Sequence, residues 1–496
     1  MKVLYQSTRD INKQNITSSR AIIQGLAPDG GLYVPTFIPK IHFSLDDLTS
    51  LTYKQLAFKV LRPFLSDFPP KELKKCIDLA YGNNFSRKEI TPIRYQEGKF
   101  FLQLFRGPTL AFKDIALQLF PYLLSCAKKQ EKLHKKIVIL TATSGDTGSA
   151  AMNGFSKVSG IKVIVFYPHN GISQIQEQQM LSQQTDNVKA LAVEGNFDDV
   201  QRKVKKIFSD KKINNKLLKN NYKFSSANSI NIGRLLPQIV YYFYAYGYLL
   251  NRNIISSGEK INFSVPTGNF GDIMAGFYAK QMGLPINRLL CASNRNKILT
   301  DFFNKGIYDK NRPFYQTNSP AMDILAPSNI ERLLFFGTQQ NVSKIKKIMK
   351  EFDTYRKVKL PKKVLTKFNN FYANNVDDKQ TLQEIKHLYT KGQIILDPHT
   401  AVASAVYRKY LNKTHDQHKT IVISTASPYK FPQTILKAIS ICPFKGNQTD
   451  AIQQIFFKTH IKVPVSLKNL IKFSTKNKKV INIKMIEKEI KKILQI

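Results

Sequence analysis

One lysine of this chain stands in an unusually apolar stretch. Lys113 lies in FRGPTLAFKDIALQ (105–118), where Ala111 and Phe112 precede it and Ile115 follows it closely. A lysine at such a place could simply cap a helix. Alternatively, burial could lower the pKa of its amine, so that the neutral form reacts with an aldehyde to give a Schiff base. The neighbouring residues leave both interpretations open.

A glycine-rich loop is the second group of residues suited to chemistry. It lies in SVPTGNFGDIMAG (264–276), where an expected strand gives way to a helix that begins near Asp272. The turn consists of Thr267, Gly268, Asn269, Phe270 and Gly271. Glycines let backbone N–H groups point at an anion and a helix start adds favourable partial charge, so the loop could cradle a phosphate. An ordinary tight turn is an equally good interpretation, and the loop is neither a Walker loop nor a GxGxxG fingerprint.

The loop TSGDTGSAA (143–151) also opens a helix after a strand. Ser144, Asp146 and Thr147 supply hydroxyl and carboxylate groups beside glycines that permit close approach. Such a loop could hold a carboxylate or a phosphate, or hydrogen-bond a phenolic oxygen. Taken alone, it is better explained as a capped helix start.

The stretch STASPYKF (424–431) places two hydroxyls, those of Ser424 and Thr425, at the end of another strand. A hydroxyl there could face a ring nitrogen in a crevice. Strand-end hydroxyls more often hydrogen-bond to the nearby backbone, so this stretch by itself does not identify a ligand.

Short β-branched runs alternate with helical patterns along the chain. The expected strands lie at 136–140, 162–168, 188–195, 261–266, 288–293 and 420–425. This alternation indicates an α/β protein with largely parallel sheets. Ligands of such sheets bind at the carboxyl ends of the strands, which is where the three loops lie.

The composition argues against several classes of protein. With 496 residues, of which 43% are hydrophobic and 22% charged, the chain is expected to be globular and to hold more than one domain. The net charge of +42 could suggest a nucleic-acid or membrane partner, but the lysines are dispersed and no nucleic-acid-binding motif accompanies them, so we predict neither. The four cysteines form no CxxC pair, and we predict no metal. The start MKVLYQSTRD has no apolar signal segment, so a cytoplasmic location is expected.

Two other groups of residues have plain explanations. His415 and His418 form an HxxH in a polar stretch, where a solvated loop is expected rather than a metal site. The aromatic cluster YYFYAYGY (241–248) is expected in the core or at a subunit interface, and base stacking is a remote alternative.

Taken together, a reactive lysine, a phosphate loop, a polar loop and a strand-end hydroxyl are the parts needed to bind pyridoxal phosphate. The chain resembles the threonine synthase family, one of the fold-type II (tryptophan synthase β-like) enzymes that use this cofactor. The resemblance rests on motifs in family order over nearly the whole chain: GLAPDGGLYVP (25–35), FRGPTLAFKD (105–114), TATSGDTGSAA (141–151), SANSINIGRLLPQ (226–238), VPTGNFGD (265–272), SPAMDI (319–324), DPHTAVA (397–403) and STASPYKF (424–431). Several of these motifs are specific to threonine synthases.

The resemblance implies roles for individual residues. Lys113 would form the Schiff base and act as the catalytic base. The implied cofactor-binding residues are Lys113, Asp146 at the ring hydroxyl, Gly268, Asn269, Phe270 and Gly271 at the phosphate, and Thr425 at the pyridine nitrogen. The implied substrate-binding residues, which would hold a carboxylate and a phosphate, are Ser144, Thr147, Asn228, Ser229 and Arg234. Many members of the wider superfamily carry Asn where this chain has Asp146, whereas threonine synthases of this type often have SGDTG.

The implied activity is that of a carbon–oxygen lyase acting on phosphate. O-phospho-L-homoserine and water would give L-threonine and phosphate by γ-elimination and β-hydration, the last step of threonine biosynthesis. A threonine dehydratase or a phospho-lyase that releases 2-oxobutyrate would keep Lys113 and the glycine loop, and a degenerate basic binding protein is the alternative from another class. The substrate is the predicted binding partner, and the chain is expected to be a monomer or a homodimer.

The resemblance also implies two open parallel-sheet domains around a cleft, plus an N-terminal lobe. The expected divisions are a lobe at 1–95, a large cofactor-binding domain at 96–122 and 255–445, a smaller α/β domain at 123–254 and a C-terminal segment at 446–496. Region 300–390 is expected to form helices and loops with little strand.

Overall fold

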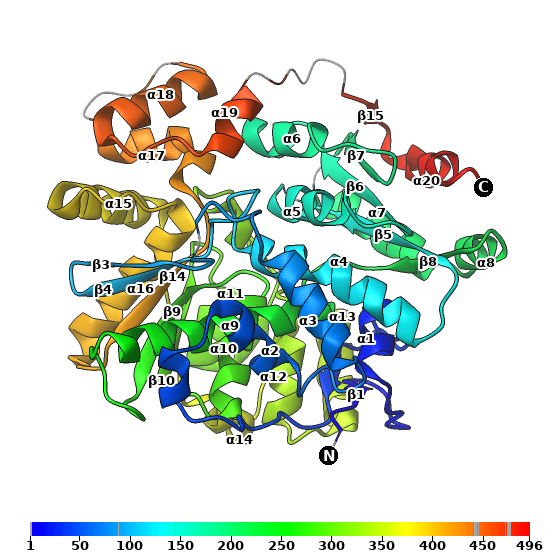
Figure 1. The fold of residues 1–496 in the computed structure, drawn as a ribbon, viewed down its shortest axis with the longest axis horizontal. Coiled ribbons are helices and arrows are strands. Elements are labelled where there is room, and N and C mark those ends of the chain that lie inside the picture. The colour runs from blue at the N-terminus through cyan, green and yellow to red at the C-terminus, as the bar shows by residue number, and fades with distance from the viewer. Residues whose placement is uncertain are drawn as a thin grey trace.

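Two sheets dominate the structure (Figure 1). The computed structural model describes residues 2–87, 89–143, 145–195, 197–440, 444, 446–471, 473 and 478–496. The larger sheet has six strands in the order β13-β10-β9-β14-β4-β3. These strands are β3 (Ile93–Gln96), β4 (Lys99–Gln103), β9 (Ile261–Pro266), β10 (Ile286–Ser293), β13 (Phe371–Asn375) and β14 (Thr420–Ser424). All neighbours are parallel except β3 and β4, which form an antiparallel hairpin.

The smaller sheet has five strands, all parallel, in the order β15-β7-β6-β5-β8. They are β5 (Lys136–Ala142), β6 (Ile161–Pro168), β7 (Val188–Val193), β8 (Tyr222–Ser225) and β15 (Val480–Ile481). Every residue of β5 except the first is buried. Such a strand can be apolar throughout because helices cover both faces of the sheet. The predicted α/β class with parallel sheets is therefore confirmed.

Helices surround both sheets (Figure 1). The long helix α4 (Lys113–Gln130) packs against α5 (Asp146–Phe155) and α9 (Ile232–Asn251). The remaining helices before β9 are α1 (Ser18–Gln24), α2 (Tyr53–Leu61), α3 (Pro70–Ala80), α6 (Gln174–Leu181), α7 (Phe197–Ser209) and α8 (Lys211–Lys219). Those after β9 are α10 (Gly271–Met282), α11 (Ile298–Lys305), α12 (Ile330–Gly337), α13 (Val342–Tyr355), α14 (Lys362–Leu365), α15 (Asp378–Gly392), α16 (Pro398–Thr414), α17 (Pro432–Ile439), α18 (Gln448–Thr459), α19 (Val465–Ile471) and α20 (Ile486–Leu494). Short 3₁₀ helices include η2 (Pro320–Met322), η3 (Thr366–Phe368) and η4 (Pro428–Lys430).

The hydrophobic core is continuous across much of the chain. One cluster joins Tyr5 near the N-terminus, Ile139 of β5 and Phe263 of β9. A second cluster packs α15, α16 and α17 on the larger sheet, and a third packs α7 and α20 on the smaller sheet. The C-terminal segment thus completes the smaller sheet, because β15 pairs with β7 and α20 packs on α7. The domain boundaries predicted from the sequence stay predictions.

The aromatic cluster of residues 241–248 lies in the middle of α9. Tyr241, Tyr242 and Tyr246 are fully buried. Two of these hydroxyls donate to one carboxyl oxygen of Asp272, from Tyr241 at 2.5 Å and from Tyr242 at 2.8 Å. Of the two explanations offered for this cluster, core packing is the one that the structure confirms.

Region 300–390 contains more strand than the sequence indicated. Two antiparallel strands, β11 (Ile307–Asp309) and β12 (Lys357–Lys359), pair within it, as β1 (Tyr5–Ser7) and β2 (Tyr33–Pro35) do near the N-terminus. The third strand, β13, forms the parallel edge of the larger sheet beside β10. Its sequence FYANN is short and half polar, so its strand character comes from pairing with β10 rather than from local pattern. None of the helices described in Figure 1 is both long and apolar enough to cross a bilayer.

Candidate functional site

Lys113 is the first residue of α4, and the loop before it is tightly closed. The backbone N–H and the hydroxyl of Thr109 donate to the Asp114 carboxylate at 2.9 and 2.6 Å. Gly107 is required there because a Cβ at this position would lie 2.4 Å from the Cβ of Asp114. Leu110 adopts the left-handed region, with φ of 60°. The turn therefore fixes the place at which the lysine side chain leaves the helix.

Thr425 is held beside Lys113 by backbone pairing. The parallel strands β4 and β14 are neighbours, and the segments that follow them also meet. The Phe112 N–H donates to the Thr425 carbonyl at 2.7 Å, and the Ser427 N–H donates to the Leu110 carbonyl at 3.0 Å. Two loops more than 300 residues apart, those of Lys113 and Thr425, are thereby brought to one edge of the sheet, as predicted for carboxyl ends of parallel strands.

Asp146 is the electrostatic centre of the site. Its Oδ2 lies 3.8 Å from the Lys113 amine, and its Oδ1 lies 2.6 Å from the Lys430 amine. Gln176 donates to the same Oδ1 at 2.8 Å. Burial alone would raise the pKa of Asp146, but the charges of Lys430 and Lys113 outweigh it and hold the pKa well below its usual range. Asp146 is therefore an ionised carboxylate between two amines.

The pKa of Lys113 is lowered to about 8, chiefly by burial. The positive charges of Arg234 and Lys430 act in the same direction, and the charge of Asp146 opposes them. The side chain is 13% exposed. Of the two interpretations of the apolar setting, a tuned amine thus fits this structure better than a simple helix cap.

At the start of α10, which the described residues include, no side-chain cap binds the first backbone N–H groups. Phe270 precedes the helix in the left-handed region, with φ of 62°, and offers no side-chain cap. Its ring packs 5.9 Å from the rings of Phe303 and Phe371, which anchors the loop in the core. At Gly268 a Cβ would lie 2.6 Å from the carbonyl oxygen of Ala321, so this position needs glycine. Such an uncapped, glycine-lined helix start suits a phosphate.

The segment at residues 226–234 lies against this loop. A Cβ on Gly271 would be 3.9 Å from the Cβ of Ser229. Arg234 is buried and donates through Nη1 to the Ala227 carbonyl at 2.9 Å, while its Nε has no hydrogen-bond partner among the described residues. Burial lowers the pKa of Arg234 to about 10, so it remains a cation at neutral pH. A buried guanidinium with a free N–H is suited to an oxyanion.

His399, for which the sequence offered no role, supports the glycine loop indirectly. The backbone N–H of Ala321 donates to its Nε2 at 3.1 Å, and its Nδ1 lies 2.8 Å from a carboxyl oxygen of Asp397. Because Nε2 accepts, the proton belongs on Nδ1. His399 therefore holds the segment whose Ala321 carbonyl faces Gly268.

The predicted site residues do not all have the same surroundings. The charges of Asp146 and Arg234 both act on the pKa of Lys113, and the backbone of Phe112, next to Lys113, pairs with that of Thr425. Thr147 lies in the first turn of α5, after Asp146. Asn228 is half-buried and donates through its backbone N–H to Ser226 at 3.1 Å. Ser144 lies outside the described residues.

The sequence analysis missed Lys430, which lies in η4. Its side chain is 0% exposed, and besides pairing with Asp146 it donates to the Thr109 carbonyl at 3.0 Å. A signal was present, because Lys430 is a single lysine between aromatic residues in SPYKF, in a chain whose other lysines come mostly in polar runs. Lys113 likewise lies beside an aromatic residue, Phe112, in an apolar stretch.

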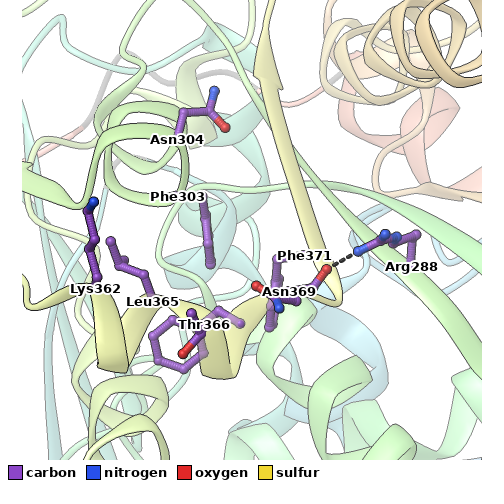
Figure 2. A pocket seen from close by; sticks show the side chains of 9 residues that line it. Arg288, Phe303, Asn304, Lys362, Leu365, Thr366, Asn369 and Phe371 are labelled. Atoms are coloured by element: carbon purple, nitrogen blue, oxygen red, sulfur yellow. Dashed lines mark hydrogen bonds between the residues drawn. The ribbon is translucent and has the colours of Figure 1, made fainter.

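A surface pocket of about 540 Å³ lies away from these loops (Figure 2). It is lined by Arg288 near the start of β10, by Phe371 at the start of β13, and by residues of α11, α14 and η3. Figure 2 shows the Arg288 side chain pointing to Asn369, and the Arg288 guanidinium donates to the backbone carbonyl of Asn369. None of the predicted site residues lines this pocket. It lies at the amino ends of strands, so it is not the site that the loops form.

The predicted residues fit pyridoxal phosphate. The uncapped start of α10 matches a phosphate, and the lowered pKa of Lys113 suits attack on an aldehyde. The hydroxyl of Ser424 at the end of β14 is buried without a hydrogen-bond partner in the described part of the chain, which leaves a polar group next to Thr425 to be satisfied. Asp146 is an ionised carboxylate near Lys113, so it could accept a hydrogen bond from a ring hydroxyl.

Comparison with known proteins gives matches along nearly the whole chain. The family description "Threonine synthase N terminus" matches residues 4–81, "Pyridoxal-phosphate dependent enzyme" matches 95–426, and "Threonine synthase, C-terminal" matches 400–492. A threonine synthase of Eremothecium gossypii is 37% identical over 474 residues, which cover 89% of this chain and 90% of that protein. Threonine synthase-like 1 of Homo sapiens is 38% identical over 90% of this chain, but only 61% of that protein is covered. The crystal structure of a threonine synthase from Brucella melitensis with bound pyridoxal phosphate superposes with a TM-score of 0.87 at 32% identity, covering 100% of both chains.

Proposed function

The chain belongs to the threonine synthase family of pyridoxal-phosphate-dependent enzymes, and from that premise we propose that it converts O-phospho-L-homoserine and water into L-threonine and phosphate. This is a carbon–oxygen lyase reaction and the last step of threonine biosynthesis. The observation that supports it most directly is the buried Lys113 amine, with a pKa lowered to about 8, beside the ionised Asp146 at the carboxyl ends of two strands.

We propose that individual residues of these loops hold the cofactor. Residues 268–271 would bind its phosphate at the start of α10, Asp146 would meet the ring hydroxyl and Thr425 the pyridine nitrogen. When bound, the cofactor supplies an aldehyde and an electron-withdrawing ring that stabilises negative charge next to the substrate's Cα. The tight backbone pairing of Phe112 with Thr425 keeps the amine and the ring-nitrogen contact in fixed relation.

Lys113 moves the protons of the reaction. Its Nζ takes one proton from Cα and one from Cβ of the substrate as the γ-phosphate leaves. Cγ then gains a proton and becomes the methyl group, water adds its hydroxyl at Cβ, and a proton returns to Cα. A base must be neutral to accept a proton. With a pKa of about 8, roughly a quarter of the amine is neutral at pH 7.5, compared with about 0.1% for an ordinary lysine.

The substrate's two anionic ends have matching donors. Arg234 offers its free Nε to the phosphate, and Ser229 lies close to the glycine loop, near Gly271. Thr147, Asn228 and Ser144 complete the proposed substrate-binding set. A fixed guanidinium at the γ-phosphate stabilises the charge that grows as the phosphate leaves.

The test is a product assay on the purified holoenzyme. O-phospho-L-homoserine should yield phosphate and L-threonine in equal amounts, and Lys113→Ala should abolish both products and the visible absorbance of the bound cofactor. Lys99→Met is a matched control because burial also lowers the pKa of Lys99 to about 8, while its partners are Glu384 and Ser404, each at 3.0 Å. The folded fraction of this variant should keep cofactor absorbance and turnover.

The product identity separates this function from its nearest rival. The similarity to threonine synthase-like 1 is as high as that to threonine synthases, so identity alone does not separate them. Release of phosphate together with 2-oxobutyrate, and no threonine, would mean a phospho-lyase. If the protein shows no visible absorbance of bound cofactor after pyridoxal phosphate is added, it is neither a threonine synthase nor a phospho-lyase.

A biosynthetic role of this kind also favours a cytoplasmic location, with the chain acting as a monomer or homodimer. Cell fractionation tests the location, and light scattering at several protein concentrations tests the oligomeric state. Recovery of the protein in a membrane or organelle fraction, or a mass above that of a dimer, would contradict these proposals.

A further inference from the structure

A buried arginine outside the predicted site joins three separated parts of the chain. Arg332 lies in α12 and is 0% exposed. Its Nε donates to the Tyr33 carbonyl at 3.1 Å and its Nη2 to the Ile230 carbonyl at 2.6 Å. Its Nη1 donates to the side-chain oxygen of Asn329. The planar fork of a guanidinium allows one residue to serve three acceptors in fixed directions.

Two of these acceptors lead directly to the proposed site. Ile230 follows Asn228 and Ser229 in the segment proposed to bind substrate. Asn329 donates to the Asn269 carbonyl of the glycine loop twice, through its backbone N–H at 3.1 Å and its side-chain amide at 3.0 Å. The substrate segment and the cofactor-phosphate loop are thus tied to one guanidinium, and a Cβ on Gly271 would lie 3.5 Å from Asn329 Nδ2 and 3.9 Å from the Ser229 Cβ.

The charge of Arg332 is hard to explain by stability alone. In the described part of the chain no hydrogen bond or ion pair joins it to a carboxylate, and the neighbouring Glu331 is bound instead by Arg9, at 2.8 Å. Burial lowers the pKa of Arg332 to about 10, so it is still charged at neutral pH. Burying this cation costs free energy, which the carbonyl acceptors and the nearby charge of Glu331 return only in part.

We propose that Arg332 is a positioning residue that fixes the cofactor-phosphate loop and the substrate segment relative to each other. The affinities for the cofactor and for the substrate then both depend on this side chain. The inference rests on the proposed function for the identity of the two ligands. It adds that a residue touching neither ligand controls the spacing of both anion-binding elements. The contact with Tyr33 extends the same control to the N-terminal strand β2.

The experiment compares Arg332→Lys with the partial variant Asn329→Ala. The dissociation constant of pyridoxal phosphate is measured by absorbance titration of the apoprotein without substrate, and KM and kcat for O-phospho-L-homoserine are measured with saturating cofactor. Loss of one or two charge-assisted hydrogen bonds predicts that R332K raises the cofactor dissociation constant and KM each by about 10- to 100-fold. Asn329→Ala should raise the cofactor dissociation constant by about tenfold, while KM changes less than about twofold.

Arg9→Ala is the matched control. Arg9 also ties the N-terminal part of the chain to α12, through Glu331, but it contacts neither loop. R9A should lower the thermal midpoint without changing either affinity. If R332K behaves in this way, or shifts one affinity alone, the proposal is wrong.

Two further comparisons keep the result interpretable. In the double variant R332K/N329A the effects on the cofactor dissociation constant should not add, because both act through Asn269. If R332K fails to fold, an unchanged cofactor dissociation constant in N329A overturns the proposal. A product other than threonine would refute the proposed function alone, since the cofactor dissociation constant is measured by binding and KM can be obtained from phosphate release whatever the second product is.

Discussion

Removing the charge of Lys430 should raise the pKa of Lys113. The two amines share the Asp146 carboxylate, at 2.6 Å from Lys430 and 3.8 Å from Lys113. A like charge at roughly 6 Å in a medium of effective dielectric about 20 costs about 3 kcal/mol, or about two pKa units. Lys430→Met removes this repulsion, so that of the two amines only Lys113 remains beside the Asp146 carboxylate. The pKa of Lys113 should therefore rise from about 8 toward the value of an ordinary lysine.

The assay follows the rate at which pyridoxal phosphate enters the apoprotein, since only the neutral amine attacks an aldehyde. The rate should increase with pH through the pKa of Lys113, with an inflection near pH 8 in the wild type. In K430M the inflection should move up by about one to two pH units. The visible absorbance of the bound cofactor gives the rate without any need for turnover.

Two further variants have different expected effects on the inflection. Lys430→Arg keeps a cation near Asp146 and should leave the inflection within about 0.3 pH units, a difference of less than 0.5 kcal/mol. Asp146→Asn removes the charge that raises the pKa of Lys113, so its inflection should fall below that of the wild type. An inflection that stays in place or falls in K430M would refute the electrostatic account of this site.

Three other perturbations test separate parts of the structure. Gly268→Ala should weaken cofactor binding by about tenfold, because its Cβ would lie 2.6 Å from the Ala321 carbonyl; an unchanged dissociation constant in the same titration would contradict the tight fit. Arg234→Lys should raise KM for O-phospho-L-homoserine by about 10- to 100-fold and leave the cofactor dissociation constant unchanged; the reverse pattern in steady-state kinetics would place Arg234 at the cofactor instead. Burial raises the pKa of Asp272 to about 6, above its ordinary 3.8, so the wild type loses stability as pH rises through this interval. Asp272→Asn should lack this loss, which is about 3 kcal/mol in full and about 2 kcal/mol between pH 4.5 and pH 7. Urea unfolding at these two pH values that gives the same pH dependence for both proteins would disprove the assignment.

Much of the site is visible in the sequence because its pieces are local. A strand, a glycine turn and a helix start within a dozen residues, as in SVPTGNFGDIMAG, mark a possible phosphate loop, which the other motifs of the chain then favour over an ordinary turn. The apolar flank of Lys113 is equally local. The parallel strands could be recognised because burial on both faces makes them continuous apolar runs, as in β5.

The residues that the sequence did not reveal are those whose roles depend on distant partners. Arg332 lies in IERLLFFG, where a charged residue on an amphipathic helix is ordinarily solvent-exposed. Only packing against β2 and the segment before α9 buries it and supplies its acceptors. The strand β13 was missed for the same reason, since its partner β10 lies about 80 residues earlier.

The sequence by itself determined the class of fold, because buried parallel strands are short apolar runs, and the cofactor type, because motifs in family order extend over nearly the whole chain. The tertiary structure alone decided the charge balance around Lys113. Lys430 meets Asp146 across 284 residues of chain, and a pKa depends on distances and burial that no local pattern contains. Chemistry was thus encoded locally, whereas the tuning of that chemistry came from long-range packing.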